Sequence, residues 1–137
     1  MSQRTNEADV AAVTETVRTY YDGMIAGDEA KLGRAFHPRA SVVGNEHGEF
    51  TWSTLDEFIA ECEQAAADAG PYDWRIEGLS FVGDTALVRF GGQFAGVWYT
   101  DDLSLVRVDG AWRIVHKTFY AHPGTSPAPE DQAPGRC

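Results

Sequence analysis

The N-terminal half of the chain places apolar residues at steps of three and four, which is the spacing of one face of a helix. The first such segment spans residues 7–25, and its apolar positions are Val10, Val13, Val17, Tyr20, Tyr21, Met24 and Ile25. Gly27 ends this predicted helix. Asp28 is a suitable N-cap for a short second helix that runs through Phe36 and ends at Pro38.

A third predicted helix follows two extended segments. Residues 40–43 and 50–52 flank the sequence Gly44-Asn45-Glu46-His47-Gly48, which is typical of a turn. Ser53 and Thr54 then precede two acidic residues, as at the capped start of a helix. The apolar face of this helix consists of Leu55, Phe58, Ile59, Cys62 and Ala66, and Gly70-Pro71 ends it.

After Tyr72 the pattern changes to the alternation that is typical of strands. The predicted strands are residues 73–81, 85–90, 94–108 (as one long bent strand or two) and 111–120. Asp109-Gly110 is the strongest hairpin signal in the chain. Because Gly91-Gly92 and Gly96 interrupt the run, we expect a bulge or a sharp bend there.

Helices followed by a run of strands indicate an α+β domain. We expect a curved antiparallel sheet that packs on three N-terminal helices and, through its glycine bends, encloses a cone-shaped pocket. One domain is predicted for residues 7–122, after a flexible N-terminus at 1–6. Residues 123–137 carry four of the six prolines, and we expect this tail to be disordered.

Composition excludes several kinds of partner. The 137 residues carry 11 Lys and Arg against 21 Asp and Glu, which gives a net charge of −10. No basic cluster offsets this charge, so we expect neither nucleic acid nor an anionic membrane surface as a partner. We also expect no signal peptide and no membrane span. Cys62 and Cys137 are predicted to be separate thiols rather than a disulfide, and the predicted location is the cytoplasm.

The chain also lacks the common signatures of bound cofactors. It has no G-x-x-x-x-G-K phosphate loop and no G-x-G-x-x-G dinucleotide motif. The four histidines have no pair at the spacing of metal ligands; they are His37, His47, His116 and His122. We therefore predict no metal and no organic cofactor.

Three segments resemble the nuclear transport factor 2-like (NTF2-like) superfamily, and within it the SnoaL-like branch with domains known as putative lumazine-binding. They are YYDGMIAGDEAKL at residues 20–32, AFHPRA at 35–40 and YTDDLSLVRVDGAWRIVHKTF at 99–119. The resemblance covers residues 8 to about 122, and it implies the cone fold and a homodimer that forms through the sheet. The Tyr-Asp pair of dehydratases in this superfamily falls on Met24 and Ile25 here, so that pair is not carried over. Members include lyases, isomerases, cyclases, transport factors and assembly modules, so the fold alone does not decide the function.

Two histidines are candidates for acid–base chemistry. His37 lies in the Phe-His-Pro segment of the family, where it is either a proton shuttle at the cavity mouth or a cap of the preceding helix. His116 alternates with Trp112 and Ile114 along the last strand. If those two side chains face the helices, His116 also points into the cone, where a general base or a ligand anchor belongs. The alternative is a sheet histidine with hydrogen-bond partners, or one that faces a dimer partner.

The role of Asp102 depends on the turn at Asp109-Gly110. A two-residue turn pairs Asp102 with Lys117, which makes an ordinary cross-strand ion pair. A three-residue turn with a bulge shifts the pairing by one and puts Asp102 on the same face as His116, where the carboxylate can orient the imidazole. The sequence leaves both registers open.

Aromatic residues are numerous, and we predict that a few line a pocket for a planar ligand while most form core or dimer surface. The predicted ligand-binding residues are Tyr20, Met24, Trp52 and Trp98. Tyr20 lies on the buried stripe of the first helix, and its hydroxyl needs a hydrogen-bond partner. Trp98 follows the glycine-rich bend, where the cone opens.

Three hypotheses for the function follow. The first is a cofactor-independent lyase, isomerase or cyclase that acts by proton transfer on a small carbonyl or aromatic compound. In this hypothesis His116 with Asp102, or His37, is the base, and Tyr20 donates a hydrogen bond to the developing enolate. The second is a non-catalytic binding protein for an aromatic or heterocyclic small molecule. The third is a dimeric assembly module.

Overall fold

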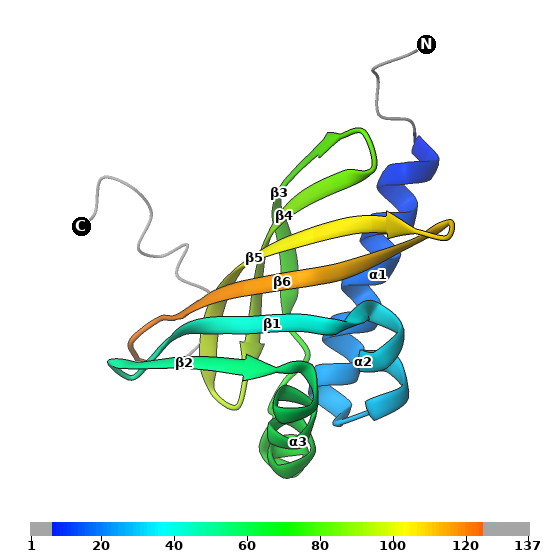
Figure 1. Cartoon of the computed structure of the whole chain (residues 1–137). Helices are drawn as coiled ribbons and strands as arrows, with labels where there is room; N and C mark the ends of the chain where they lie inside the picture. Colours follow the sequence, from blue (N-terminus) through cyan, green and yellow to red (C-terminus); the bar gives the residue numbers. More distant parts are fainter. Residues whose placement is uncertain (1–6, 125–137) are drawn as a thin grey trace, which may run out of the picture.

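A computed structural model describes residues 7–124, so the N-terminal segment 1–6 and residues 125–137 of the predicted tail lie outside the described residues. The helices are α1 (Glu7–Ala26), α2 (Glu29–Ala35), α3 (Leu55–Ala65) and the 3-10 helix η1 (Ala66–Asp68). The strands are β1 (Phe36–Glu46), β2 (Glu49–Thr54), β3 (Trp74–Val82), β4 (Thr85–Phe94), β5 (Val97–Val108) and β6 (Ala111–Ala121). The helices lie on one side of a strongly curved sheet (Figure 1), which confirms the predicted α+β cone.

The six strands form one sheet in the order β2-β1-β6-β5-β4-β3. All neighbouring strands are antiparallel except β1 and β6, which are parallel, so the sheet is mixed and not wholly antiparallel as expected. The reason is the path of the chain: after β2 it crosses through α3 to the far edge of the sheet. The meander β3 to β6 then returns toward the first hairpin and ends beside β1 in the same direction.

The second helix is shorter than the sequence predicted. It ends at Ala35, and Phe36 is already extended, with φ −105° and ψ 148°. Pro38 lies inside β1 and does not end a helix. Proline is tolerated there because the pairing of β1 with β6 is irregular between Phe36 and Ser41, so no ladder hydrogen bond is lost.

The expected bulge is absent from β4 at Gly91 and Gly92. Pairing with β5 is regular from Thr85 to Phe94, and a turn at Ala95-Gly96 joins two separate strands. Gly91 and Gly92 instead make room for aromatic rings. A Cβ atom on Gly91 would lie 2.7 Å from the ring of Trp98.

The core lies between the helices and the sheet, and aromatic rings dominate it. Tyr20 and Tyr21 of α1 are fully buried, as are Phe36 of β1 and Phe90 of β4. Tyr20 packs edge-on against Phe36 and Phe90, with ring centroids 5.5 and 5.3 Å away. Its hydroxyl is therefore held deep inside the cone, at a place that the packing of α1, β1 and β4 defines.

One cysteine falls within the described residues. Cys62 of α3 is buried and makes no disulfide there, and burial raises the pKa of its thiol to about 12. Cys137 lies outside the described residues.

Gly44 of β1 lies opposite Phe119 of β6, with no room for a side chain between the two strands. A Cβ atom at Gly44 would clash with the carbonyl oxygen of Phe119 and would lie 2.8 Å from its ring. We expect Gly44→Ala to lower the free energy of unfolding by about 1–3 kcal/mol, because the two strands must separate to admit the methyl group. Urea denaturation measures this change, provided that the m value stays constant.

Gly33→Ala is the matched control for this prediction. Gly33 is exposed in α2 and would place its new methyl group with no atom within 4 Å. Because alanine is the better helix former, this variant should be neutral or more stable, by up to about 1 kcal/mol. Equal stabilities for the two variants would contradict the role assigned to the contact between β1 and β6.

Candidate functional site

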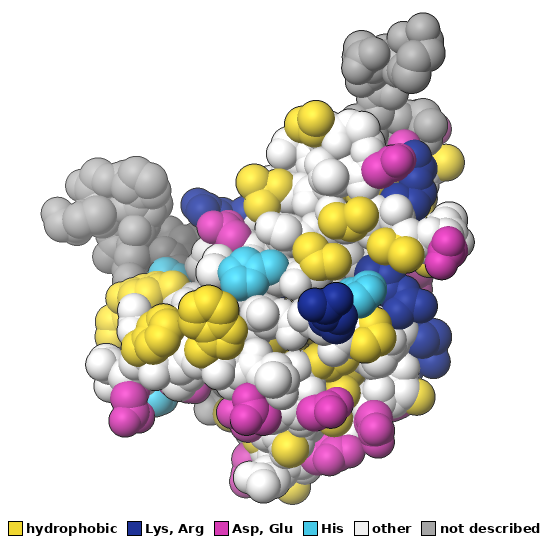
Figure 2. Space-filling model, in the orientation of Figure 1, with side chains coloured by type: hydrophobic (Ala, Val, Ile, Leu, Met, Phe, Trp, Pro, Cys, Tyr) yellow, Lys and Arg dark blue, Asp and Glu magenta, His cyan; other side chains and the backbone are white. Residues whose placement is uncertain are grey.

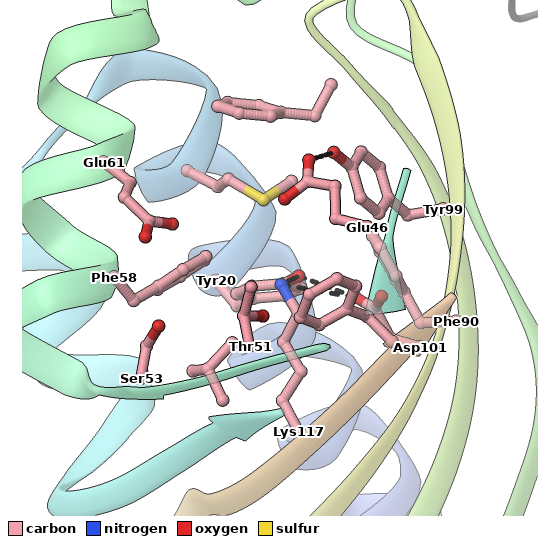
Figure 3. Close-up of a pocket in the computed structure, with 14 residues that line it drawn as sticks. Tyr20, Glu46, Thr51, Ser53, Phe58, Glu61, Phe90, Tyr99, Asp101 and Lys117 are labelled. Carbon is pink, nitrogen blue, oxygen red and sulfur yellow. Dashed lines mark hydrogen bonds and ion pairs between the residues drawn. The ribbon is translucent and has the colours of Figure 1, made fainter. Parts of the chain in front are cut away.

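A cavity opens on the helix-covered side of the sheet, between α1, α3 and the strands β1, β2, β4, β5 and β6 (Figure 3). Its enclosed volume is about 80 Å³, which is room for several water molecules or a compound of a few heavy atoms; the cavity is open on one side, so a larger ligand would extend out of it. The lining residues are Tyr20, Met24, Val42, Glu46, Thr51, Ser53, Phe58, Glu61, Phe90, Phe94, Tyr99, Asp101, Lys117 and Phe119. The cavity therefore combines an aromatic wall with a few polar groups, as small-molecule sites do.

Three buried polar side chains on the cavity wall form a connected group, the Tyr20–Asp101–Lys117 triad. The Tyr20 hydroxyl donates a hydrogen bond to Oδ2 of Asp101 at 2.7 Å. Nζ of Lys117 donates to the Tyr20 oxygen at 2.7 Å and lies 3.8 Å from Oδ2 of Asp101. All three residues are almost completely shielded from solvent, with Lys117 the most exposed at 4%.

The strands β5 and β6 place two members of the triad on the same face of the sheet. Asp101 is opposite Phe119, and Leu103 is opposite Lys117, so Asp101 and Lys117 are diagonal neighbours. Tyr20 approaches them from α1, as Figure 3 shows. Three separate elements are therefore needed to complete the triad.

The carboxyl group of Asp101 is the most unusual member of the triad. Burial raises its pKa, and the Lys117 ammonium and the hydrogen bond from Tyr20 offset part of that rise. Its Oδ1 atom is buried and has no hydrogen-bond partner among the described residues. A carboxylate with one engaged and one free oxygen is suited to accept a proton from a bound molecule.

The hydroxyl of Tyr20 stays protonated near neutral pH. Burial raises the pKa of Tyr20 well above its usual value, and the negative charge of Asp101 raises it further. Tyr20 thus remains a hydrogen-bond donor to Asp101 while it accepts a bond from Lys117.

Two carboxylates line the cavity away from the triad. Glu46 of β1 accepts a hydrogen bond from the Tyr99 hydroxyl, and Glu61 of α3 is exposed at the edge of the cavity. Burial raises the pKa of Glu61, and the nearby Glu46 charge raises it further. These two acids, with Thr51 and Ser53, give this part of the cavity an acidic, hydrogen-bonding character.

Two of the four predicted ligand-binding residues line the cavity, namely Tyr20 and Met24. Trp52 does not; it is 66% exposed on β2 and packs against Phe50. Trp98 is buried, but its ring packs against the Arg75 guanidinium of β3 and does not line the cavity. Its indole nitrogen has no hydrogen-bond partner among the described residues.

The predicted orientation of His116 is wrong, and the reason is a β-bulge. The turn at Asp109-Gly110 has two residues, since Val108 pairs with Ala111. The pairing then shifts by one residue: Leu105 is opposite Ile114, and Ser104 is opposite His116. Val115 therefore has no partner on β5, which defines a β-bulge. Trp112 and Ile114 are buried, but after the extra residue it is Lys117, not His116, that lines the cavity.

Asp102 and His37 lie outside the cavity as well. The bulge pairs Asp102 with Thr118, and its carboxylate makes a two-pronged ion pair with Arg89 at 2.7 and 2.8 Å. This hydrogen bonding with Arg89 lowers the pKa of Asp102. His37 accepts a hydrogen bond from the backbone N–H of Arg39 through Nδ1. None of the three predicted catalytic residues lines the cavity. Asp102 and His116 are diagonal neighbours on the same face of the sheet, as one of the two registers required, but this face is not the one that lines the cavity, and the Asp102 carboxylate bonds to Arg89.

Two of the three triad residues were missed by sequence reasoning. Asp101 and Lys117 are the sequence neighbours of the candidates Asp102 and His116. A shift of one residue in the alternation along each strand decides which member of each pair lines the cavity. A usable signal was the rarity of lysine, because Lys31 and Lys117 are the two lysines in the chain and Lys117 lies within a strand. Within residues 7–124, no three His, Cys, Asp or Glu side chains gather as a metal site would require.

The fold and the cavity together define an NTF2-like protein with a pocket of small-molecule size. The family model described as "Putative lumazine-binding" matches residues 8–120, so the chain belongs to that family. No helix within residues 7–124 has the length and hydropathy to cross a membrane.

Similar proteins of known structure support the same assignment. An NTF2-like protein from Silicibacter pomeroyi is 37% identical, with a TM-score of 0.82, over 87% of this chain and 100% of that chain. A ketosteroid isomerase-like protein from Erwinia carotovora atroseptica is 14% identical, with a TM-score of 0.68, over 89% of this chain and 100% of the other, which shows the fold alone. Aldolase FrzH of Cladobotryum sp is 25% identical over 125 residues, 90% of this chain and 99% of that protein.

Proposed function

We propose that the protein is a cofactor-independent enzyme, a lyase, isomerase or cyclase, that acts by proton transfer on a small carbonyl compound. The observation that carries the proposal is the buried Tyr20–Asp101–Lys117 triad on the wall of a cavity, with one carboxylate oxygen free. Buried ion pairs cost desolvation energy and are weak devices for stability, so their presence beside a cavity points to chemistry.

Each member of the triad has a distinct part in this chemistry. Asp101 removes a proton from the carbon next to the carbonyl group through Oδ1, and it returns the proton to the product. Tyr20 holds Oδ2, which keeps the free oxygen in place. The Lys117 ammonium has hydrogen-bond donors beyond the one that Tyr20 accepts, and it stabilises the negative charge that develops on the substrate oxygen.

The similarity to Aldolase FrzH supports this class of reaction. An aldolase makes or breaks a carbon–carbon bond beside a carbonyl group, and this requires a stabilised enolate or its equivalent. The similarity extends over nearly the full length of both chains.

Deuterium exchange tests the proposal directly. The protein is incubated in D₂O with acetone, hydroxyacetone, aminoacetone or cyclohexanone, and loss of the α-hydrogen signal is followed by proton NMR. We expect exchange of at least one of these ketones above the rate in buffer alone. If none of the four exchanges faster than in buffer, the proposed proton transfer is overturned.

The acidic residues of the cavity predict which carbonyl compounds are preferred. Glu46 and Glu61 repel an anionic substrate and favour a neutral or cationic one. We expect Glu61→Gln to raise the exchange rate of pyruvate relative to hydroxyacetone by about 2–5-fold, since an exposed charge contributes up to about 1 kcal/mol. Glu63→Gln, on the same helix but not lining the cavity, is the control and should leave the ratio unchanged.

A second candidate function is non-catalytic binding of an aromatic or heterocyclic molecule. The observation that favours it is the ring-lined wall, where Phe58 stacks on Tyr20 at 6.5 Å and Phe90 and Phe119 complete the lining. The family description supports the same reading. Calorimetry with lumazine tests it: saturable binding with lumazine recovered unaltered, together with no exchange of any ketone, supports this candidate over the first.

The homodimer and the cytoplasmic location remain proposals. Exposed aromatic residues support the dimer, because Phe50 and Trp52 of β2 and Tyr120 of β6 are each more than half exposed. Figure 2 shows hydrophobic side chains gathered over this end of the sheet. Sedimentation equilibrium at several concentrations tests the dimer, and a monomer mass throughout would rule it out.

A further inference from the structure

We propose that Lys117 is a nucleophile that forms an imine with the carbonyl carbon of a small aldehyde or ketone in the cavity. This inference rests on the proposed function and names its substrate class and its covalent step. In the proposed function the Lys117 ammonium only stabilises negative charge, whereas here its nitrogen forms a covalent bond to the substrate.

The lysine content of the chain makes Lys117 stand out. The chain has two lysines, and the other one, Lys31, lies on the short helix α2, partly exposed. Among residues 7–124, Lys117 is the one buried cationic side chain. An arginine would serve for charge alone and is the usual choice for a buried ion pair, whereas only the lysine amine can become a neutral nucleophile.

The surroundings of Nζ are those of a reactive amine. The atom lies 4.3 Å from the centroid of the Phe58 ring, 5.0 Å from that of Tyr20 and 5.6 Å from that of Phe119. One carboxylate, that of Asp101, balances its charge at 3.8 Å. Figure 3 shows the Lys117 side chain directed toward Tyr20 on the cavity wall, and Lys117 lines the cavity, so a ligand there meets the amine.

The Tyr20 hydroxyl provides a path for the proton that the amine must lose. Lys117 donates to the Tyr20 oxygen, and Tyr20 donates to Asp101, each over 2.7 Å. When one proton moves along each bond, the ammonium–carboxylate pair becomes an amine and a carboxylic acid, and Tyr20 is unchanged. Burial in an apolar site favours this neutral pair, and the burial-raised pKa of Asp101 acts in the same direction.

The covalent step balances with the groups at the site. The nitrogen lone pair attacks the carbonyl carbon, the C=O π electrons move to oxygen, and Asp101 returns its proton to that oxygen. The carbinolamine nitrogen then gives a second proton to the Asp101 carboxylate, which passes it to the hydroxyl group. The lone pair freed on nitrogen forms C=N as the C–O bond breaks, and the oxygen leaves as water. Of the three protons on the original ammonium, two leave in the water and one stays on the iminium nitrogen, and the Asp101 carboxylate is restored as its counter-ion.

The iminium then makes the substrate reactive. It withdraws electrons more strongly than the carbonyl group, so the Asp101 carboxylate can take the α-proton while the C–H electrons form the C=C bond of an enamine and the C=N π pair returns to nitrogen. Cleavage of a bond to the α-carbon uses the same electron path. Addition of water to the iminium reverses the first step and releases the product.

Reductive trapping tests the imine. The wild-type protein is mixed with hydroxyacetone and sodium borohydride, and the intact mass and the peptide map are recorded. We expect a gain equal to the mass of hydroxyacetone less one oxygen atom, located on Lys117 in preference to Lys31 and the N-terminal amine. A label that is absent, or that is spread over these amines without preference for Lys117, overturns the proposal.

Two variants distinguish imine formation by Lys117 from a purely electrostatic role of its positive charge. Lys117→Arg retains the positive charge, and we expect it to lose both the trapped adduct and ketone deuterium exchange. Lys31→Arg should keep both. Far-UV circular dichroism and thermal melting check that the variants fold, and trapping in the wild-type protein needs no variant at all.

The outcomes distinguish this inference from the proposed function. If Lys117→Arg keeps wild-type deuterium exchange, the imine is overturned and proton transfer by Asp101 stands. If the wild-type protein exchanges no ketone, the proposed function fails, whatever borohydride traps.

Discussion

Replacing Asp101 with asparagine is expected to slow ketone deuterium exchange by about 10²–10⁴-fold, the usual contribution of a general base. Asparagine can still accept the Tyr20 hydrogen bond, but it cannot take a proton from carbon. The measurement is the NMR exchange assay in D₂O with the ketone that the wild-type protein turns over best. A decrease of less than about fivefold would contradict the role of Asp101 as the base.

Asp102→Asn is the matched control for this prediction, because Asp102 is the next residue along β5 and pairs with Arg89 away from the cavity. We expect its rate to stay within about twofold of the wild-type rate, since a surface ion pair contributes about 0–1 kcal/mol to stability and does not touch the substrate. If Asp101→Asn proves unstable because Lys117 loses its counter-charge, the double variant Asp101→Asn/Lys117→Met removes both charges and allows the structure to be checked.

The exchange rate should also depend on pH in a definite direction. Asp101 acts as a base only when it is ionised, so the rate rises with pH through its pKa in the folded protein. Since burial raises that pKa, the rise should occur at higher pH than for an ordinary aspartate. A rate that is already constant around the usual pKa of aspartate, and above it, would show that another group is the base.

Lys117→Met is expected to lower the free energy of unfolding by about 3–4 kcal/mol at pH 7. Removing one partner of a buried ion pair leaves the other uncompensated, which typically costs about 3–5 kcal/mol. The upper limit here is the cost of protonating Asp101 instead, about 4 kcal/mol at pH 7 for a carboxyl with an unfolded pKa of about 3.9. Urea unfolding at equal m values measures the loss.

The destabilisation in Lys117→Met should decrease as the pH falls. Without the ammonium the folded pKa of Asp101 rises further, so the folded state binds a proton that the unfolded state has released. Compared with the wild type, Lys117→Met therefore loses stability as the pH rises from the pKa of Asp101 in the unfolded chain toward its raised pKa in the folded variant. At pH 5 the cost of protonating Asp101, which sets the upper limit of the loss, falls to about 1.5 kcal/mol.

The double variant Asp101→Asn/Lys117→Met completes a thermodynamic cycle. With no buried charge left, its loss of stability should be clearly smaller than the sum of the two single losses. Additive losses, or a loss in Lys117→Met that is independent of pH between 5 and 7, would show that the two groups are not ionically coupled.

Much of the fold was predictable from the sequence, because helix periodicity and helix capping depend on residues that are close together along the chain. The helical spacing of Val13, Val17 and Tyr20 predicted the buried face of α1, and each is fully buried. Thr54 and Glu57 form the expected capping box of α3. These features need no information from distant parts of the chain.

The candidate site was predictable only in part. Tyr20 and Met24 were identified because they lie on the buried face of α1, where position follows from helical periodicity. Asp101 and Lys117 were missed because strict alternation along β6, starting from Trp112 and Ile114, directs His116 inward. The extra residue Val115 reverses the alternation, and no local signal in the sequence marks it.

The sequence by itself determined the three helices in outline, the position of the hairpin turn at Asp109-Gly110 and the family to which the chain belongs, whereas the length of that turn came from the structure. The tertiary structure alone decided the parallel pairing of β1 with β6, the bulge at Val115 and the composition of the triad. The physical reason is distance along the chain: Tyr20 lies 81 residues from Asp101 and 97 from Lys117. Which polar side chains share a buried site depends on how three separate elements pack, and the pattern of neighbouring residues does not contain that information.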